Sequence, residues 1–442
     1  MIGSPNADQA KAEAEFVDFL LNPAEKEMKL IGPGGTGKSW LVQRLITVAM
    51  AEYRQNCRAL GLEPEYDKYA LTALSNRAAQ ELADHTGLDV QTIHSFLCLA
   101  IRPNFQTGKQ DLKRTQSWTI HDKYIIFVDE AYMMDGLLLD ELRMATMNCK
   151  IVFIGDNKQL DPIEDAISSV ENLQVRTAEL TISVRTDDPH LKALNQLLRD
   201  NVAGAVAEQQ GGPPNIWPEL HNIHVPGVID HFTQPELEAF LQGPMLMPDG
   251  KNLIVAFSNQ RVNDYNSYMR ALRGQGHLFQ PGEVLISNDM FERGKMRIRN
   301  EATVHITKAD PQMTWIKKNG LDIPTQYVET ENYPGEKIPV VLDRDFMRDA
   351  IKWAAKEAKA KRQDWQFYFE LKQDFADFRP RDASTIHKAQ GSSKNLVIID
   401  LDNIGSCNFP VMVARLLYVA ASRARIRVIF FGKLPPRYGG PA

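Results

Sequence analysis

Gly32-Pro33-Gly34-Gly35-Thr36-Gly37-Lys38-Ser39 is the stretch of this 442-residue sequence that decides its fold. It follows the apolar run Met28–Ile31 and opens a helical pattern, so we predict a strand, a tight loop and a helix in that order. Glycines at these positions let backbone N–H groups face phosphate oxygens, and the helix N-terminus adds the positive end of its dipole. The pattern therefore predicts a nucleotide-phosphate site rather than a chance glycine-rich turn.

The side chains of this loop have expected roles at a triphosphate. Lys38 is expected to neutralise the β- and γ-phosphates, and the Ser39 hydroxyl to occupy one position of a bound Mg²⁺. We therefore predict ATP and Mg²⁺ as cofactors. The residues expected to surround the phosphates are Gly32, Gly34, Gly35, Thr36, Gly37, Lys38 and Ser39.

A second apolar run, Ile125–Val128, ends in the carboxylates Asp129 and Glu130. At the tip of a buried strand Asp129 can hold Mg²⁺, directly or through water, and Glu130 can act as general base toward the attacking water. Two acids at a strand end could instead be solvated or cap a helix. Because the glycine-rich loop lies 91 residues upstream (129 − 38), we prefer the catalytic interpretation, and the two motifs together predict a nucleoside triphosphatase.

Outward from these motifs, short apolar strands alternate with helical patterns, which is typical of a parallel sheet with crossover helices. The pattern occurs in the first 175 residues and returns in the second half of the chain. The expected strands are Met28–Ile31, Tyr69–Leu74, Ile125–Val128 and Ile151–Ile154 in the first region, and Leu253–Phe257, Leu396–Asp400 and Val428–Phe431 in the second.

Residues 276–379 break this pattern and are predicted to be an insertion. Short β-like segments come first, and a charged helical run follows from about Asp345 to Phe378. A smaller insertion, 97–123, carries basic residues with Phe105 and Trp118. The β-like segments of the larger insertion are Glu283–Ile286, Lys295–Arg299 and Ala302–Thr307.

Composition excludes several classes of protein. A net charge of −5 argues against a protein that coats DNA nonspecifically, although it allows a locally basic channel. The four cysteines show no C-x-x-C spacing, so a zinc site is not expected and a reduced cytoplasmic setting fits. Without a run of 18 apolar residues or a signal-like start, neither a membrane span nor secretion is expected.

Further polar clusters occur in a recognisable order along the chain. Together with the two nucleotide motifs, they resemble superfamily 1 helicases of the RecD-like group, and within it the Dda helicases of T-even bacteriophages. The resemblance spans nearly the whole chain. The clusters are Ser75-Asn76-Arg77, Thr92-Ile93-His94, Gly155-Asp156-Asn157-Lys158-Gln159, Ser183-Val184-Arg185, Ser258-Asn259, Thr385-Ile386-His387-Lys388-Ala389-Gln390-Gly391 and Tyr418-Val419-Ala420-Ala421-Ser422-Arg423.

The resemblance implies an α/β fold of two tandem RecA-like domains with ATP bound between them. The first domain is expected at 1–175 with a β-hairpin insertion at 97–123. The second is expected at 176–275 and 380–442. An SH3-like β domain with a helical arm, touching the hairpin, is expected at 276–379.

The resemblance also implies individual roles at the nucleotide. Gln9 looks like the glutamine that reads adenine, although one glutamine at a helix start is a weak signal. Gln159 looks like the residue that senses the γ-phosphate and orients water. Arg185 and Arg423 look like cations that reach the γ-phosphate from the second domain, and Gly391 is expected close to the phosphate.

Single-stranded DNA is then expected to cross both domains, held by phosphate contacts and stacking without sequence readout. Helix-cap and turn chemistry is the alternative interpretation, since Ser, Thr and Asn routinely serve it. Phe105 is a candidate for stacking at the fork, with Trp118 and simple packing of the hairpin as alternatives. The other candidate DNA-binding residues are Ser75, Asn76, Thr92, His94, Asn259, Thr385, His387 and Lys388.

We therefore predict an ATP-dependent DNA helicase that moves 5′→3′, because both insertions differ from the bulky helical ones of the 3′→5′ branch. We expect a monomer in the cytoplasm of a bacterial host, with single-stranded DNA, a duplex fork and single-strand binding or replisome proteins as partners. An RNA helicase of the same superfamily is one alternative. A P-loop switch or loading factor that unwinds nothing is the other.

Overall fold

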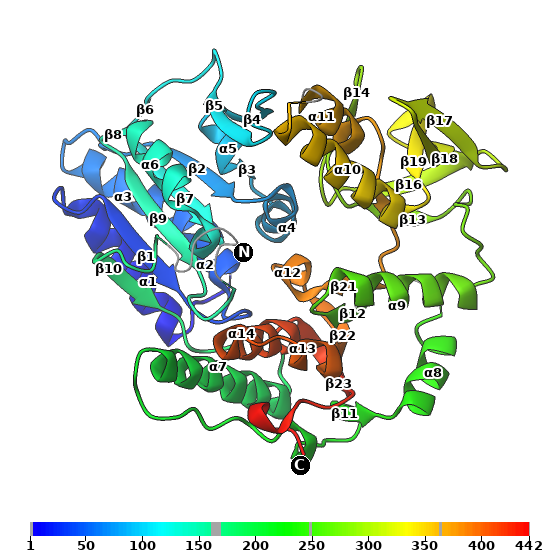
Figure 1. Cartoon of the computed structure of the whole chain (residues 1–442). Helices are drawn as coiled ribbons and strands as arrows, with labels where there is room; N and C mark the ends of the chain where they lie inside the picture. Colours follow the sequence, from blue (N-terminus) through cyan, green and yellow to red (C-terminus); the bar gives the residue numbers. More distant parts are fainter. Residues whose placement is uncertain (1–2, 161–168, 247–249, 362–364, 442) are drawn as a thin grey trace.

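The computed structural model describes residues 3–160, 169–246, 250–361 and 365–441. Figure 1 shows two α/β units beside each other, with a mainly β unit next to the second. Among the described helices, none combines the length and apolar character that a bilayer crossing requires.

The first unit is built on a parallel sheet of six strands in the order β10-β1-β9-β7-β2-β3. Helices cover both of its faces, so the central strands β7 and β9 are almost entirely buried and their sequences are apolar apart from Asp129 and Lys150 at their ends. Its strands are β1 (Glu27–Ile31), β2 (Lys68–Ala73), β3 (Gln91–Thr92), β7 (Tyr124–Asp129), β9 (Lys150–Gly155) and β10 (Arg176–Glu179), and its helices are α1 (Ala7–Leu21), α2 (Lys38–Arg44), α3 (Met50–Ala59), α4 (Asn76–Thr86), α5 (Ile93–Phe96) and α6 (Gly136–Met144).

The predicted boundary after residue 175 is wrong. Strand β10 pairs in parallel with β1 at the edge of the first sheet, so the first domain extends through Glu179. Only Ala178 of this strand is buried, and the polar sequence of an edge strand gives no apolar run by which to recognise it.

The second unit has a parallel sheet in the order β11-β23-β22-β12-β21, again with an apolar cluster on each face. This topology repeats that of the first unit and agrees with the predicted fold class. Its strands are β11 (Ile229–Phe232), β12 (Asn252–Ala256), β21 (Ala383–Thr385), β22 (Lys394–Asp400) and β23 (Ala424–Phe431), and its helices are α7 (Pro189–Gln209), α8 (Gln234–Gln242), α9 (Asn259–Leu272), α12 (Ile386–Ala389), α13 (Leu401–Gly405) and α14 (Pro410–Ala421).

The third unit is an antiparallel sheet in the order β17-β18-β16-β13-β20, with β19 on β18. Helix α11 ends at Gln373, so the helical run predicted to Phe378 is too long: Phe378–Arg379 form β20, which pairs with β13. Residues 362–364 of that run lie outside the described residues. The other elements are β13 (Val284–Ser287), β14 (Phe291–Arg293), β15 (Met296–Ile298), β16 (Thr303–Ala309), β17 (Thr314–Lys318), β18 (Leu321–Thr330), β19 (Tyr333–Val341), α10 (Arg344–Lys359) and α11 (Trp365–Gln373).

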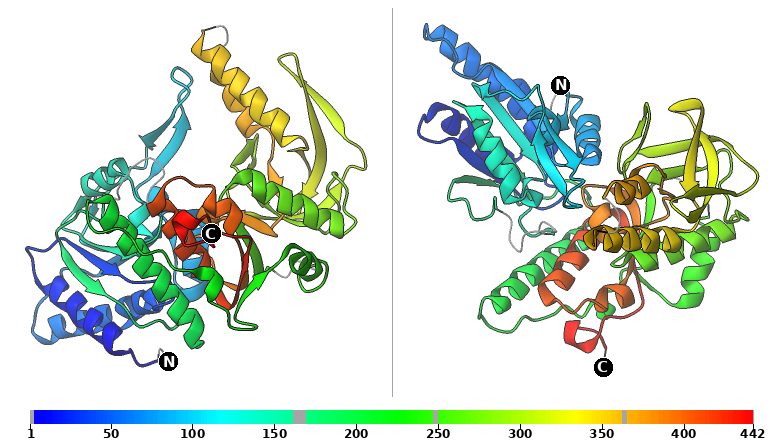
Figure 2. Two further views of the ribbon diagram at one scale, coloured as in Figure 1. Left: turned by 60° about the horizontal axis from the view of Figure 1, so that its bottom comes forward. Right: turned by 45° about the horizontal axis from the view of Figure 1, so that its top comes forward.

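A two-stranded hairpin projects from the first unit toward the helices of the third. It consists of β4 (Leu99–Pro103) and β5 (Gln110–Arg114), paired antiparallel. Figures 1 and 2 place it on the same side of the molecule as α10 and α11. A side-chain carbon at Gly108, in the hairpin turn, would lie 2.2 Å from the Trp365 ring, so the hairpin and α11 are in contact.

Candidate functional site

The glycine-rich loop lies between β1 and α2, where the sequence places it. Gly35 has a φ of 89°, and a Cβ there would come within 2.2 Å of the Arg185 Cβ, so only glycine fits. Lys38 Nζ donates to the carbonyl oxygens of Gly32 at 2.6 Å and Pro33 at 3.0 Å. The lysine side chain is thus folded over the loop, beside the place where it is expected to neutralise the phosphates of a bound nucleotide.

Two carboxylates and the lysine share this buried region. Burial, and then the charge of Glu130, raises the pKa of Asp129 to about 7, while Lys38 acts in the opposite direction. Burial likewise raises the pKa of Glu130 and lowers that of Lys38. Glu130 has a φ of 53°, in the left-handed region, at the turn that follows β7.

Arg423 reaches the glycine-rich loop from the second unit. It is 1% exposed, and its guanidinium donates to Val419 O at 3.1 Å and to Ser422 Oγ at 2.8 Å. A Cβ at Gly34 would lie 3.3 Å from Arg423 Nη2 and 3.2 Å from Arg185 Nη1. Two guanidinium groups therefore flank one glycine of the predicted phosphate-binding loop.

The assignment of Arg185 to the second domain is corrected by the structure. The preceding residue, Val184, donates its N–H to Gly35 O at 2.6 Å, which fixes this segment to the glycine-rich loop. The Arg185 guanidinium in turn donates to Ser422 O of the second unit. Arg185 therefore bridges the cleft from the connecting segment between β10 and α7. Burial, and then the like charges of Arg423 and Arg425, lower its pKa to about 9.

Gln9 combines the two interpretations that the sequence left open. Its backbone N–H and side chain form a capping box with Asn6 at the start of α1. Its amide Nε2 also donates to Thr36 O at 3.2 Å, inside the glycine-rich loop. The glutamine is 5% exposed, and its predicted role at the adenine stays a prediction.

Gln159 lies in the turn after β9, where both units hold its side chain. Its Nε2 donates to Asp156 Oδ2 at 3.3 Å, and its Oε1 accepts from Gln390 Nε2 of the second unit at 2.9 Å. The predicted γ-phosphate sensor therefore stands at the junction of the two units. Gly391 lies nearby, where a Cβ would be 3.6 Å from the Glu81 carboxylate of α4.

The predicted DNA-binding residues occupy equivalent places in the two units. Thr92 caps α5 after edge strand β3, and Thr385 caps α12 after edge strand β21. Ser75 caps α4 after β2, and Ser258 caps α9 after β12. Helix capping, the alternative interpretation, is thus present at each of these positions.

The repeated strings Ser-Asn and Thr-Ile-His are the sequence signal of this equivalence, and the sequence analysis missed it. In the second unit, an insertion of 104 residues (379 − 276 + 1) separates Ser258-Asn259 from Thr385-Ile386-His387 and so obscures the match. Each Thr-Ile-His string ends in a histidine, His94 or His387, whose pKa burial lowers. Both imidazoles are therefore expected to be neutral at pH 7.

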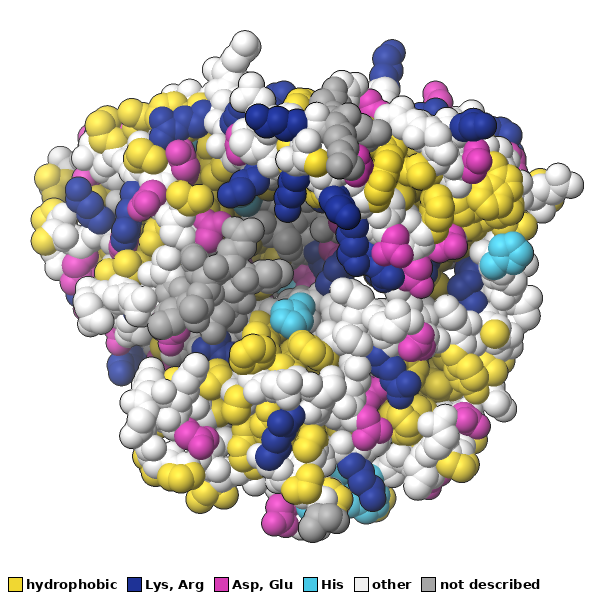
Figure 3. Space-filling model, viewed as in Figure 1, with side chains coloured by type: hydrophobic (Ala, Val, Ile, Leu, Met, Phe, Trp, Pro, Cys, Tyr) yellow, Lys and Arg dark blue, Asp and Glu magenta, His cyan; other side chains and the backbone are white. Residues whose placement is uncertain are grey.

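A hollow of about 550 Å³ lies where the three units meet. Predicted DNA-binding residues Asn76, Asn259, Thr385 and Lys388 line it, and Figure 3 shows Lys and Arg side chains gathered around the central hollow of this face. Ser75, Thr92, His94 and His387 are not among its lining residues. The basic residues that the sequence analysis missed here are Arg77, Arg299, Arg379, Arg381 and Lys394.

One carboxylate of the third unit enters this hollow. Glu301 pairs with Lys388 at 3.0 Å and with Arg77 at 3.5 Å, so it contacts cations of both α/β units. Arg299, two residues earlier, donates to Asn76 Oδ1 at 3.4 Å. The turn at 299–302 therefore occupies part of the predicted DNA path.

Phe105, at the hairpin tip, packs edge-on against Phe369 of α11 with ring centroids 5.5 Å apart, yet stays 54% exposed. Trp118 instead packs against the core of the first unit, under the Arg114 guanidinium at 4.2 Å. Of the two aromatic candidates, Phe105 is therefore the exposed one, and its contact with Phe369 is the packing given above as the alternative interpretation.

Comparison with known proteins identifies relatives over nearly the full length. The family model described as an AAA domain matches residues 6–211, and the family model described as a UvrD-like helicase C-terminal domain matches residues 382–431. The chain is 24% identical to the ATP-dependent DNA helicase dda of Enterobacteria phage T4, covering 90% of this chain and 93% of that protein. It is 21% identical to an uncharacterized protein of Acanthamoeba polyphaga mimivirus, covering 96% and 99%.

Among solved structures, the Pif1 helicase from Bacteroides in complex with ADP-AlF3 and ssDNA is similar, with a TM-score of 0.50 and 14% identity. The match covers 98% of this chain and 94% of that chain. It confirms the predicted fold of two RecA-like domains.

Proposed function

We propose, on the premise that this chain belongs to the superfamily 1 helicases of the Dda and Pif1 type, that it is an ATP-dependent DNA helicase moving 5′→3′ on single-stranded DNA. The observation that carries the proposal is the meeting of Arg423 of the second RecA-like domain with Gly34 of the first. Cations supplied across the cleft stabilise the charge on the γ-phosphate only when the domains are closed, so hydrolysis and domain movement are coupled.

The residues at the cleft also fit Mg²⁺. Asp129 and Glu130 lie together at a buried strand end, where burial, and then the neighbouring charge of Glu130, raises the pKa of Asp129. A divalent cation would offset both effects by stabilising the ionised carboxylate. Ser39 and Asp129 would hold the ion, which supplies charge neutralisation at the β- and γ-phosphates. Glu130 is then left to accept the proton of the attacking water.

The proposed nucleic-acid path follows from the hollow where the three units meet. Its lining includes six Lys and Arg residues against three acidic ones, and it joins the strand ends of both RecA-like domains. Side chains of this kind suit the phosphates of a single strand. Because one chain supplies both sides of the ATP cleft, the active species proposed is a monomer. Replisome or single-strand binding partners and a location in a bacterial host stay predictions from the sequence.

ATP turnover is expected to be slow without nucleic acid and to rise at least about tenfold with single-stranded DNA, because a strand bridging both domains favours the closed cleft. Phosphate release is measured with oligonucleotides of one sequence made as DNA and as RNA. Stronger stimulation by RNA would favour the RNA helicase alternative. No stimulation by either strand would favour a P-loop switch that unwinds nothing.

Glu301→Gln is expected to tighten binding of single-stranded DNA about five- to tenfold at low salt, because the carboxylate occupies Lys388 and Arg77 and must leave when a phosphate arrives. Fluorescence anisotropy with a labelled oligothymidylate measures this, and the difference should shrink as salt rises. Glu292→Gln, an exposed position of the same unit, is the matched control. Unchanged or weaker binding by Glu301→Gln would mean that Glu301 only tethers the units.

A further inference from the structure

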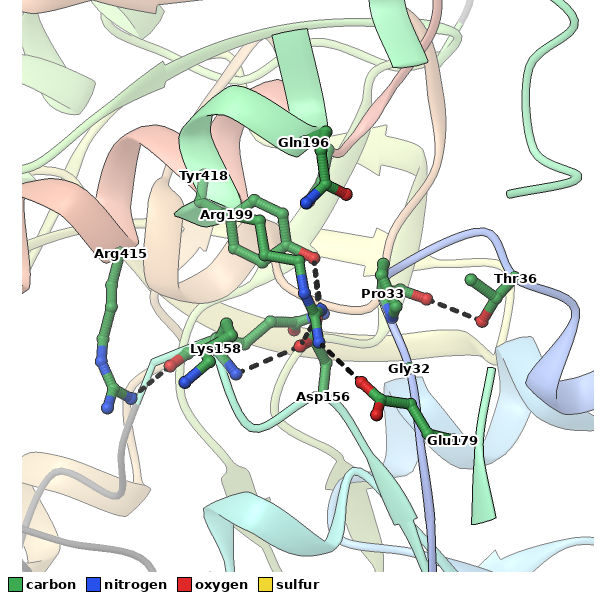
Figure 4. A network of polar contacts seen from close by, with 12 residues as sticks. Gly32, Pro33, Thr36, Asp156, Lys158, Glu179, Gln196, Arg199, Arg415 and Tyr418 are labelled. Carbon is green, nitrogen blue, oxygen red and sulfur yellow. Dashed lines mark hydrogen bonds and ion pairs between the residues drawn. The ribbon is translucent and has the colours of Figure 1, made fainter. Parts of the chain in front are cut away.

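Side chains of the second RecA-like domain contact the turn after β9, residues 156–159. Figure 4 shows Arg199 of α7, with Tyr418 and Arg415 of α14, converging on it. Arg415 donates to Gln159 O, and Gln390 donates to the Gln159 side chain. The turn is therefore a principal junction between the two domains.

Asp156 is the centre of this junction. Its side chain is 0% exposed, and its carboxylate accepts hydrogen bonds from both domains. Tyr418 Oη donates to Oδ2 at 2.6 Å and Arg199 Nη1 to Oδ1 at 2.9 Å. Within the first domain, Lys158 N donates to Oδ1 at 3.1 Å and Gln159 Nε2 to Oδ2 at 3.3 Å.

A buried carboxylate is tolerated only when its charge is paired and its oxygens are hydrogen-bonded. The second domain supplies both the paired charge, on Arg199, and the short hydrogen bond from Tyr418. Separating the domains would remove both donors and return Asp156 to water. We therefore expect the contact to be lost when the cleft opens.

The same carboxylate oxygen, Asp156 Oδ2, accepts from Tyr418 and from Gln159. The other end of the Gln159 amide accepts from Gln390, so closure orients both ends of this side chain. Tyr418 also precedes Arg423 by five residues, and the two therefore move together. Burial and the Asp156 carboxylate raise the pKa of the Tyr418 hydroxyl, which keeps it a donor.

We propose that the Tyr418 hydroxyl and Arg199, acting through Asp156, are positioning residues that set the amide of Gln159 for hydrolysis when the second domain closes on the first. This inference rests on the proposed function for the reaction that Gln159 serves. It assigns the transmission of closure to three named side chains, none of which lines the hollow proposed as the DNA path.

Tyr418→Phe tests the inference with the smallest change. The ring remains to fill the core, and only the hydroxyl is lost. We expect kcat for ATP to fall about tenfold with and without DNA while KM for ATP stays within about twofold, since a charge-assisted hydrogen bond made on closure is removed. Tyr438→Phe is the matched control, because its buried hydroxyl donates to Cys407 O within the second domain at 2.9 Å.

A binding measurement separates positioning from catalysis. In the wild type, ADP with aluminium fluoride should change the affinity for an oligothymidylate, and Tyr418→Phe should lose most of that change while Tyr438→Phe retains it. Asp156→Asn should give the same loss, and the double variant should be no worse than Asp156→Asn alone. Thermal melting identifies any variant that is merely unfolded.

The failure of the inference differs from the failure of the proposed function. A wild type whose turnover ignores DNA would contradict the proposed function, and the kcat of Tyr418→Phe without DNA would still test the junction. A Tyr418→Phe variant that matches Tyr438→Phe in kcat, and in the response to ADP–aluminium fluoride where the wild type has one, would overturn the inference.

Discussion

Lys38→Ala is expected to lower DNA-stimulated ATP turnover by at least about 10³-fold. The lysine Nζ lies against the carbonyls of Gly32 and Pro33, beside the carboxylates at the end of β7. Without this lysine, the loop has no cationic side chain to neutralise the negative charge that develops between the β- and γ-phosphates during hydrolysis. The fold should persist, because Lys38 starts α2 and contributes nothing to an apolar cluster.

Steady-state phosphate release with saturating single-stranded DNA measures this effect, and circular dichroism melting checks the fold. Lys11→Ala is the control, since that lysine is 79% exposed on α1. A folded Lys38→Ala protein that turns over ATP at the wild-type rate would remove the loop from the catalytic site.

Glu130→Gln is expected to bind ATP normally but to hydrolyse it about 10²- to 10⁴-fold more slowly, because the general base is lost while its shape is kept. Burial raises the pKa of Glu130, whereas the charges of Lys38 and Arg423 act in the opposite direction and favour its ionised form. The neutral amide cannot accept the proton of the attacking water.

Single-turnover hydrolysis and binding of a fluorescent ATP analogue, measured on the same preparation, separate the two steps. Glu52→Gln, at an exposed position of α3, serves as the control. Weakened analogue binding with an unchanged hydrolysis step would assign Glu130 to binding instead, and would place the base on another residue.

Structural elements whose signal lies in one continuous run of residues are predicted best from the sequence. Strands β1, β2, β7 and β9 are apolar because helices cover both faces of the sheet, so a short run of sequence carries the whole signal. Strand β10 has almost no apolar signal, because the sequence of an edge strand with one buried residue resembles that of a polar linker. That single omission misplaced both the domain boundary and Arg185.

The candidate site divides in the same way. Residues that act through local motifs, such as Lys38 and Glu130, are identified by their neighbours in sequence. Asp156, Arg199 and Tyr418 meet only through packing of the two domains, across sequence separations of 43 and 262 residues, and no local pattern records such a meeting. The same holds for Glu301, whose role depends on cations that α4 and α12 bring to it.

The most direct test of the account is unwinding of one duplex that carries either a 5′ or a 3′ single-stranded tail. Strand separation is followed by fluorescence with ATP and Mg²⁺, with the blunt duplex and the Lys38→Ala protein as controls. The account predicts efficient unwinding of the 5′-tailed substrate and little of the others, with the β4–β5 hairpin meeting the fork. Efficient unwinding of the 3′-tailed substrate alone would contradict it.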